Sequence, residues 1–215
     1  MQRIIAALAL SGASAFVAPV AKTSAVARAS DATETAAPAK TGFTYADLKA
    51  LAKEQNPIVG YFDPLELGDK DFWEQGNEAT IGFLREAEIK HGRICMLAWT
   101  GFVATDLGFT LPGDMHQVSS VEAHDVACKY GAMQQIFLWI SFVEVVHSFG
   151  VAQMMWMGSD RQPGDFGLDP LDFCSTPEKA ADMKLKEITH CRLAMFAFSG
   201  VVTQAVLTGK GFPYF

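Results

Sequence analysis

Residues 86–97 read EAEIKHGRICML, so a run of charged side chains leads directly into an apolar stretch. The pattern returns later: when the sequence is shifted by 99 residues, positions 88–108 align with 187–207, and eight of the 21 residues are identical. The identical residues include a glutamate, a histidine and an arginine, which chance similarity between two apolar helices does not readily explain. A second repeated element precedes each helix, FDPLELGD at 62–69 and FGLDPLDF at 166–173. The sequence therefore predicts two helices of one design, related by a pseudo-two-fold axis.

The charged residues of these two helices need partners from outside their own helix. Glu88 and Arg93 lie five residues apart, about 140° around the axis at ~3.6 residues per turn, and point to different sides. An unpaired charge at the centre of a membrane helix costs ~2.5–3.5 kcal/mol on insertion scales. We therefore predict that Glu88 pairs with Arg192 of the other helix. By symmetry, Glu187 then pairs with Arg93. Small residues are expected to let the two backbones approach closely, at Gly92, Gly101, Gly200 and Ala98 or Ala197.

Three apolar segments, at about 81–107, 126–157 and 183–207, set the fold class. The middle one contains QQIFLWISFVEVVHSFGVAQMMWM, which at ~1.5 Å per residue is long enough to cross a ~30 Å hydrocarbon core. The other two carry charges in their first turns, and each taken alone could be a core helix of a soluble bundle. No strand-like alternation or Asn-Gly hairpin signal competes with helix. The expected class is an all-α membrane protein with three transmembrane helices.

Composition excludes nucleic-acid binding, and the N-terminal sequence has the form of a two-part targeting signal. With 215 residues, 50% of them hydrophobic, the chain has room for one or at most two domains, and its net charge of −7 offers no basic surface for nucleic acid. Residues 1–15 have the form of a signal peptide, and residues 16–30 have the acid-free, Ser- and Ala-containing composition of a transit peptide. Residues 31–60 are expected to form a polar, flexible or peripheral arm, and residues 61–215 the three-helix domain. A secreted protein with a short linker is the alternative.

Two histidines follow the paired glutamates and are candidate ligands. His91 and His190 each lie three residues after a glutamate, about 60° away on the helix surface. A single histidine in such a place often only hydrogen-bonds a neighbouring backbone group, but two at equivalent positions favour ligation. One candidate is a di-iron carboxylate enzyme, since Glu-x-x-His on two helices is half of that site and Glu144 with His147 is a third copy. That site needs two further converging carboxylates, and the two arginines would place cations beside the iron, which disfavours it.

The other candidate is a chlorophyll-binding protein, because the magnesium of chlorophyll takes an imidazole, a carboxylate or an amide oxygen as its ligand. The segments EIKHGRICML and EITHCRLAMFAFSG, each preceded by an F-D-P-L-like element, resemble the first and third membrane helices of the chlorophyll-binding light-harvesting family. The resemblance covers about residues 62–207. It implies a pigment-binding protein rather than an enzyme.

The resemblance also implies which residues hold pigment. The positions that match ligands of the family are Glu88, His91, Glu187, His190 and Gln204. His190 departs from the family, which usually has asparagine there, although an imidazole can still bind magnesium. In the middle helix, Gln135 and Glu144 resemble polar ligand positions, the alternative being polar residues that face a loop or the bundle interior.

Two features resemble one branch of the family, the fucoxanthin/chlorophyll a/c-binding antenna proteins of algae whose plastids came from a eukaryotic endosymbiont. The first is the two-part presequence at residues 1–30. The second is the short C-terminal segment, only eleven residues after Gln204, with no amphipathic fourth helix. The implied cofactors are chlorophyll a, chlorophyll c and a carotenoid, fucoxanthin or a related xanthophyll. The implied function is a thylakoid antenna that passes excitation to a photosystem I or II core, beside other antenna subunits and thylakoid lipids. A photoprotective member that dissipates excitation is the alternative.

Overall fold

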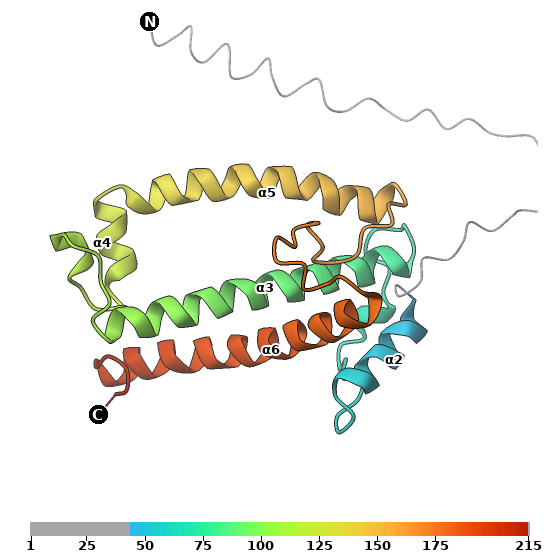
Figure 1. Ribbon diagram of the computed structural model, residues 1–215, viewed down its shortest axis with the longest axis horizontal. Coiled ribbons are helices and arrows are strands. Elements are labelled where there is room, and N and C mark those ends of the chain that lie inside the picture. The colour runs from blue at the N-terminus through green and yellow to red at the C-terminus, as the bar shows by residue number, and fades with distance from the viewer. Residues whose placement is uncertain (1–43, 215) are drawn as a thin grey trace, which may run out of the picture. The chain divides into compact units, whose positions relative to one another are not determined.

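The computed structural model describes residues 44–214, and this part of the chain is helical with no strand (Figure 1). Its α-helices are α2 (Tyr45–Gln55), α3 (Asn77–Asp106), α4 (Ala123–Lys129), α5 (Ala132–Trp156) and α6 (Pro177–Thr208), with short 3-10 helices η1 (Leu67–Asp69) and η2 (Asp114–His116). The all-α class is confirmed. The predicted signal peptide at 1–15, the transit-like segment at 16–30 and the arm up to residue 43 lie outside the described residues.

Helices α3 and α6 run side by side, and α3 lies between α6 and α5 (Figure 1). The buried apolar residues of these two helices include Ile81, Val103, Ile188, Val201 and Ala205. Where the helices come closest, Gly92 faces Cys191, and a Cβ placed on Gly92 would come within 2.1 Å of the Cys191 Cβ. These two residues are equivalent in the 99-residue repeat. Equivalent residues meet only at the axis that relates two copies, so the crossing point is where such an axis would pass.

Gly101 and Gly200 were predicted to lie at the contact between α3 and α6, and the structure places both away from it. No atom outside the adjoining turns of its own helix lies within 4 Å of a Cβ built on Gly101 or Gly200, and both glycines are exposed. Helical periodicity explains the error, since Gly101 lies nine residues after Gly92, about 900° at ~3.6 residues per turn, on the opposite side of α3. Gly200 stands in the same relation to Cys191 on α6. The close approach therefore depends on one glycine at the crossing rather than on several along the helices.

Local sequence decides where the helices begin and end. Helix α6 starts after Thr176, whose hydroxyl accepts a first-turn N–H, and Pro177 follows at the position where its missing N–H costs nothing. The helix stops at Gly209, which has a left-handed φ of 63°. The predicted segment 126–157 is broken in two, because Gly131 with a φ of 80° separates α4 from α5.

Helix α5 is apolar on every side, and most of it is exposed. Of its 25 residues, only His147 and Met154 are buried. Among residues 44–214, two helices, α5 and α6, are long and apolar enough to cross a membrane, judged by length and composition alone. Helix α3 has 30 residues, but five of its first 15 are charged, and Arg93 and Asp106 follow in its second half. A helix that is apolar all round needs an apolar surrounding, which a soluble monomer of this size does not provide for α5.

The predicted arm contains a helix in its described part. Residues 45–55 form α2, which contacts α3. Thr44 caps its N-terminus, because the hydroxyl oxygen accepts the Asp47 N–H at 3.2 Å and the hydroxyl donates to Asp47 Oδ2 at 2.6 Å. The Thr-x-x-Asp spacing is the sequence signal for this start. Residues 45–55 of the predicted arm are therefore helical.

Candidate functional site

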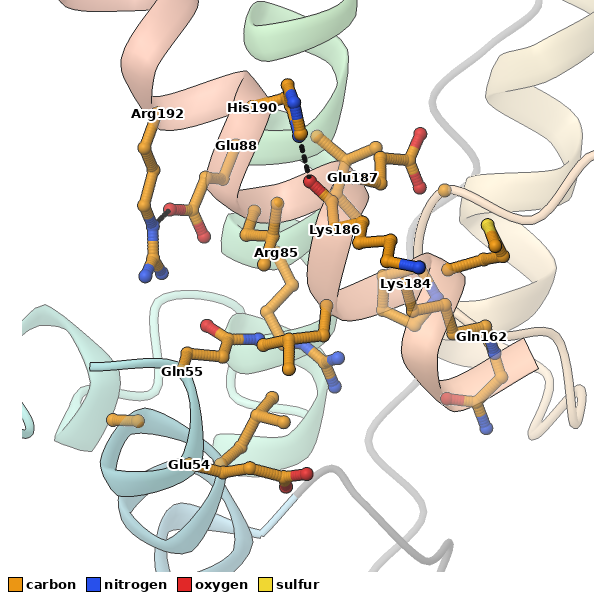
Figure 2. A pocket seen from close by; sticks show the side chains of 18 of the residues that line it. Glu54, Gln55, Arg85, Glu88, Gln162, Lys184, Lys186, Glu187, His190 and Arg192 are labelled. Atoms are coloured by element: carbon orange, nitrogen blue, oxygen red, sulfur yellow. Dashed lines mark hydrogen bonds and ion pairs between the residues drawn. The ribbon is translucent and has the colours of Figure 1, made fainter. Parts of the chain in front are cut away.

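Both predicted ion pairs are present between α3 and α6. Arg93 Nε donates a 2.7 Å hydrogen bond to Glu187 Oε1. Arg192 Nε donates a 2.7 Å hydrogen bond to Glu88 Oε1 (Figure 2). Within residues 44–214, the second carboxylate oxygen of each glutamate accepts no hydrogen bond. Each glutamate is thus neutralised by the other helix while one of its oxygens stays available for a metal.

The two predicted histidine ligands have matching local geometry. His91 Nδ1 lies 2.7 Å from the carbonyl oxygen of Ala87, and His190 Nδ1 lies 2.8 Å from that of Lys186 (Figure 2). A carbonyl oxygen only accepts hydrogen bonds, so Nδ1 carries the hydrogen of the neutral imidazole. The lone pair is then on Nε2, and both side chains are exposed. The backbone hydrogen bond was the alternative to ligation, but here it fixes the tautomer that a metal ligand needs.

The remaining predicted ligands lie apart from these four. Gln204 is exposed on α6, ~21 Å beyond His190 along the axis and within about 40° around it. Gln135 is exposed near the start of α5. Glu144 lies nine residues further on, about half a turn around the axis, and its carboxylate forms an ion pair with Lys90 of α3. The seven residues are spread over three helices and do not converge on one centre.

A large open cavity lies between α2, the two repeated D-P elements, α3 and α6 (Figure 2). Its volume is about 1690 Å³, above the ~300–1,000 Å³ that is usual for a pocket holding one small molecule. Glu88, Glu187 and His190 stand in its wall among mostly apolar side chains. Bulky, largely apolar ligands with one polar attachment point match this lining.

The repeated elements before α3 and α6 fold into matching turns. Asp63 accepts hydrogen bonds from the N–H groups four and five residues further on, at 3.1 and 2.8 Å, and Asp169 does the same at 3.1 and 2.8 Å. The Cys174 N–H is the main reason that the pKa of Asp169 is lowered. Burial raises the pKa of Asp63, but the amides and the Tyr61 hydroxyl outweigh it, so its pKa also lies below the usual value. The repeat therefore includes the approach to each helix as well as the helix itself.

A buried charge cluster that the sequence did not predict joins α3 to the loop between α5 and α6. Glu86 is only 3% exposed. Arg161 donates to both of its oxygens, at 3.1 and 3.3 Å, and the Gly164 N–H donates to Oε2 at 2.6 Å. His147 Nε2 lies 2.9 Å from Oε1 as an electrostatic contact, without the alignment of a hydrogen bond. Both oxygens of Glu86 are therefore occupied, unlike those of Glu88 and Glu187.

The same cluster extends to the second repeated element. The ring of Phe166 lies 4.6 Å from the His147 ring, and the guanidinium groups of Arg93 and Arg161 lie over it at 5.3 and 5.9 Å. The sequence does indicate that Glu86 and Glu88 lie on different faces of α3, because residues two apart on a helix are about 200° apart around its axis. Its partner Arg161 is 75 residues away in the loop GSDRQPGDFG, and nothing in the sequence links the two residues.

The di-iron alternative depends on converging acidic and imidazole ligands. Among the described residues, no group of three or more His, Cys, Asp and Glu side chains is placed to hold a metal ion. His147, from the third Glu-x-x-His copy, is turned toward Glu86 instead.

Comparison with known proteins agrees with this arrangement. Residues 46–206 match the family described as chlorophyll A-B binding protein. A light-harvesting complex stress-related protein 3.2 of Chlamydomonas reinhardtii is 31% identical over 81% of this chain and 70% of its own. A fucoxanthin-chlorophyll a-c binding protein A of Phaeodactylum tricornutum is 35% identical over 55% of this chain and 58% of its own. A fucoxanthin-chlorophyll a-c binding protein of Chattonella marina var. antiqua is 28% identical over 96% of this chain and 88% of its own.

The family match takes in both repeated helices, both D-P turns and α5, which is well over half of the chain. The match includes the residues with free ligand atoms and the apolar cavity. It also includes the exchanged ion pairs, Glu88–Arg192 and Glu187–Arg93, in which each helix supplies one glutamate and one arginine. The chain therefore belongs to the chlorophyll A-B binding protein family, a family of pigment-binding light-harvesting proteins.

Proposed function

We propose that the protein is a thylakoid antenna that binds chlorophyll a, chlorophyll c and a carotenoid and passes excitation energy to a photosystem. The observation that carries the proposal is the pair of neutralised glutamates, each followed three residues later by a histidine whose Nε2 is free. Chlorophyll supplies the light absorption and the excited state. The chain's own part is to hold each pigment at a fixed distance and orientation from the next.

Five residues of α3 and α6 are the proposed magnesium ligands on these helices: Glu88, His91, Glu187, His190 and Gln204. Glu88 and Glu187 offer a carboxylate oxygen whose charge is already balanced, so that a pigment can bind without burying a net charge. His190 is proposed as a ligand in spite of its departure from the family, because its tautomer matches that of His91. On α5, Gln135 and Glu144 are proposed as further ligands.

The carotenoid is proposed to lie in the cavity beside the two D-P turns. The cavity is mostly apolar, and residues 61–63 and 162–169 line it on either side. Two relatives carry fucoxanthin and chlorophyll a-c binding in their names, which supports fucoxanthin or a related xanthophyll here.

In the membrane, α3 is proposed to span together with α5 and α6. Glu86, Glu88, Lys90 and Arg93 in its middle are matched by partners on the neighbouring helices and in the loop before α6, which removes most of the cost of burying these four charges. Residues 1–15 and 16–30 are proposed to deliver the chain to the plastid, and named relatives are chloroplastic. The proposed neighbours are a photosystem I or II core, other antenna subunits and thylakoid lipids.

A photoprotective role is the second candidate. It is favoured by one observation, the 31% identity to a stress-related light-harvesting protein over 81% of this chain. Fluorescence lifetimes of the isolated protein separate the two roles. A lifetime of chlorophyll a that shortens strongly on acidification supports dissipation, and one that stays long supports harvesting.

The direct test is spectroscopy of the native protein isolated in mild detergent. We expect chlorophyll a emission that is excited through the absorption bands of chlorophyll c and of the carotenoid. Such an excitation spectrum requires pigments close enough to exchange energy. A colourless preparation, or emission excited only through chlorophyll a itself, contradicts the antenna proposal.

Replacing Arg192 with leucine is expected to abolish pigment-loaded folding. The change removes the ion-pair partner of Glu88 and leaves only the weaker electrostatic interaction with Arg85, and an unpaired charge in a membrane helix costs ~2.5–3.5 kcal/mol on insertion scales. The double variant Arg192→Leu with Glu88→Gln restores charge balance and keeps an oxygen ligand, so we expect it to recover part of the yield. The measurement is the yield of chlorophyll-containing complex after reconstitution. A wild-type yield from Arg192→Leu alone contradicts the role of the ion pair.

A further inference from the structure

The ring of Phe166, in the second repeated element, lies against two arginine side chains. The guanidinium carbon of Arg93 is 5.3 Å from the centre of the ring, and that of Arg161 is 5.9 Å from it. Both distances fall within the ~6 Å over which the face of an aromatic ring attracts a cation. Arg93 belongs to the ion pair with Glu187, and Arg161 belongs to the buried cluster around Glu86. Phe166 is therefore the side chain through which a proposed ligand pair meets the buried cluster.

The loop that carries Phe166 is fixed on α3. The Gly164 N–H donates a 2.6 Å hydrogen bond to Glu86, and a Cβ placed on Gly164 would lie 2.9 Å from two side-chain carbons of Ile89. The carbonyl oxygen of the residue before Phe166 accepts a 3.0 Å hydrogen bond from Arg161 Nε. Phe166 itself remains 53% exposed, so burial in a core does not explain its position. The loop instead presents the ring to the large cavity, which it helps to line.

The two repeated elements differ at this position. When they are aligned on their Asp-Pro pairs, Gly60 takes the place of Phe166. Nothing lies within 4 Å of a Cβ built on Gly60, and no aromatic ring of residues 44–214 lies against the guanidinium of Arg192, the counterpart of Arg93. Side-chain exposure follows the same order, 33% for Arg93 and 43% for Arg192. The two ion pairs therefore have the same hydrogen bond but a different environment.

We propose that Phe166 is a positioning residue for the pigment bound at Glu187: its ring holds the guanidinium of Arg93, and Arg93 fixes the carboxylate of Glu187. Arg93 makes one hydrogen bond to Glu187, through Nε, and this single contact leaves the guanidinium free to turn. A ring against the guanidinium removes this freedom and keeps the second carboxylate oxygen of Glu187 in one orientation. The inference rests on the proposed function, in which Glu187 is a magnesium ligand.

A packing role for Phe166 in the buried cluster is the competing explanation, because the ring also lies 4.6 Å from that of His147. The two explanations predict different effects of removing the ring. If the ring only covers the cluster, its loss loosens the loop, and the Gly164 amide exchanges faster. If the ring positions Arg93, pigment binding weakens while the Gly164 amide stays protected by its hydrogen bond.

The test reconstitutes Phe166→Leu, Phe166→Tyr and the wild type at increasing concentrations of chlorophyll a and c in a fixed ratio, with fucoxanthin held constant. Leucine is apolar without an aromatic face, whereas tyrosine keeps the ring. The measurements are the number of chlorophylls per polypeptide and the hydrogen exchange of the Gly164 amide. We expect Phe166→Leu to need about two- to five-fold more chlorophyll to reach its full count, as the loss of one exposed cation–π contact implies. Phe166→Tyr is expected to fill like the wild type, with slow Gly164 exchange in all three proteins.

Two further comparisons locate the effect. Phe62→Leu makes the same change in the first repeated element, where the ring also lines the cavity but no cation of residues 44–214 lies against it. This control should fill like the wild type. Arg93→Leu with Glu187→Leu removes the ligand together with its counter-charge, and adding Phe166→Leu to this double variant should change nothing further.

Filling of Phe166→Leu at the wild-type chlorophyll concentration overturns the inference and leaves the proposed function intact. Weak filling together with fast Gly164 exchange overturns it in favour of packing. A further loss when Phe166→Leu is added to the double variant overturns the role of Arg93. If the double variant assembles too poorly to measure, the comparison of Phe166→Leu with Phe166→Tyr and Phe62→Leu still decides. A wild-type protein that binds no chlorophyll at all overturns the proposed function itself.

Discussion

Replacing Gly92 with alanine is expected to lower the yield of pigment-loaded protein by about tenfold or more. The added Cβ would lie 2.1 Å from the Cβ, 2.5 Å from the Sγ and 2.8 Å from the Cα of Cys191. The Cα belongs to the backbone of α6 and cannot rotate away, so the two helices have to separate. Overpacking costs ~1–3 kcal/mol, and ~1.4 kcal/mol is a factor of ten. The separation also stretches both exchanged ion pairs, which flank the crossing on either side.

Gly101→Ala is the matched control for this prediction. It makes the same chemical change in the same helix, but nothing lies within 4 Å of the new Cβ. Alanine is favoured over glycine in a helix by ~1 kcal/mol, so the control protein should be at least as stable as the wild type. The comparison is made by thermal melting of the chlorophyll circular dichroism after reconstitution. Equal melting of the Gly92→Ala and Gly101→Ala proteins contradicts the close crossing.

The exchanged ion pairs could be predicted because a repeat contains three-dimensional information. Once two helices share a register, the symmetry decides which glutamate meets which arginine, and both pairs were found as expected. The glycines were harder, because the small residues were identified by type alone. Gly101 fits the motif as well as Gly92 does, but helical phase puts it on the other side of α3.

Glu86 could not be assigned from sequence, although it is the most buried carboxylate described. Its chemistry is identical to that of Glu88 two residues later, and only the partners tell them apart. Those partners are a loop arginine and a loop amide 75 and 78 residues away. No periodicity links a loop to a helix over that distance, whereas the 99-residue repeat did link α3 to α6.

The ligand predictions for α5 had the weakest basis for the same reason. No second copy of α5 exists in the repeat, so nothing in the sequence predicted the face on which Glu144 lies or its partner Lys90. His147 was a candidate ligand only in the di-iron alternative, as part of a third Glu-x-x-His copy, and the structure buries it against Glu86. Residue spacing identifies candidates, but the neighbouring element decides which of them keeps a free ligand atom.

Replacing Glu86 with leucine is expected to release the loop between α5 and α6 and to prevent stable assembly. Arg161 then loses both hydrogen bonds to the carboxylate and keeps only the Asp165 carbonyl oxygen and the weak Met154 sulfur as acceptors. The Gly164 N–H loses its 2.6 Å partner, and His147 loses its contact with Oε1. Breaking a buried ion pair by removing one partner costs ~3–5 kcal/mol, most of it from the charge left behind. The double variant Glu86→Leu with Arg161→Met removes both charges and should regain much of that loss. Hydrogen exchange of the Gly164 amide is the measurement: we expect fast exchange in Glu86→Leu and slow exchange in the wild type. Slow exchange and full pigment yield in the single variant are the results that contradict a structural role for this cluster.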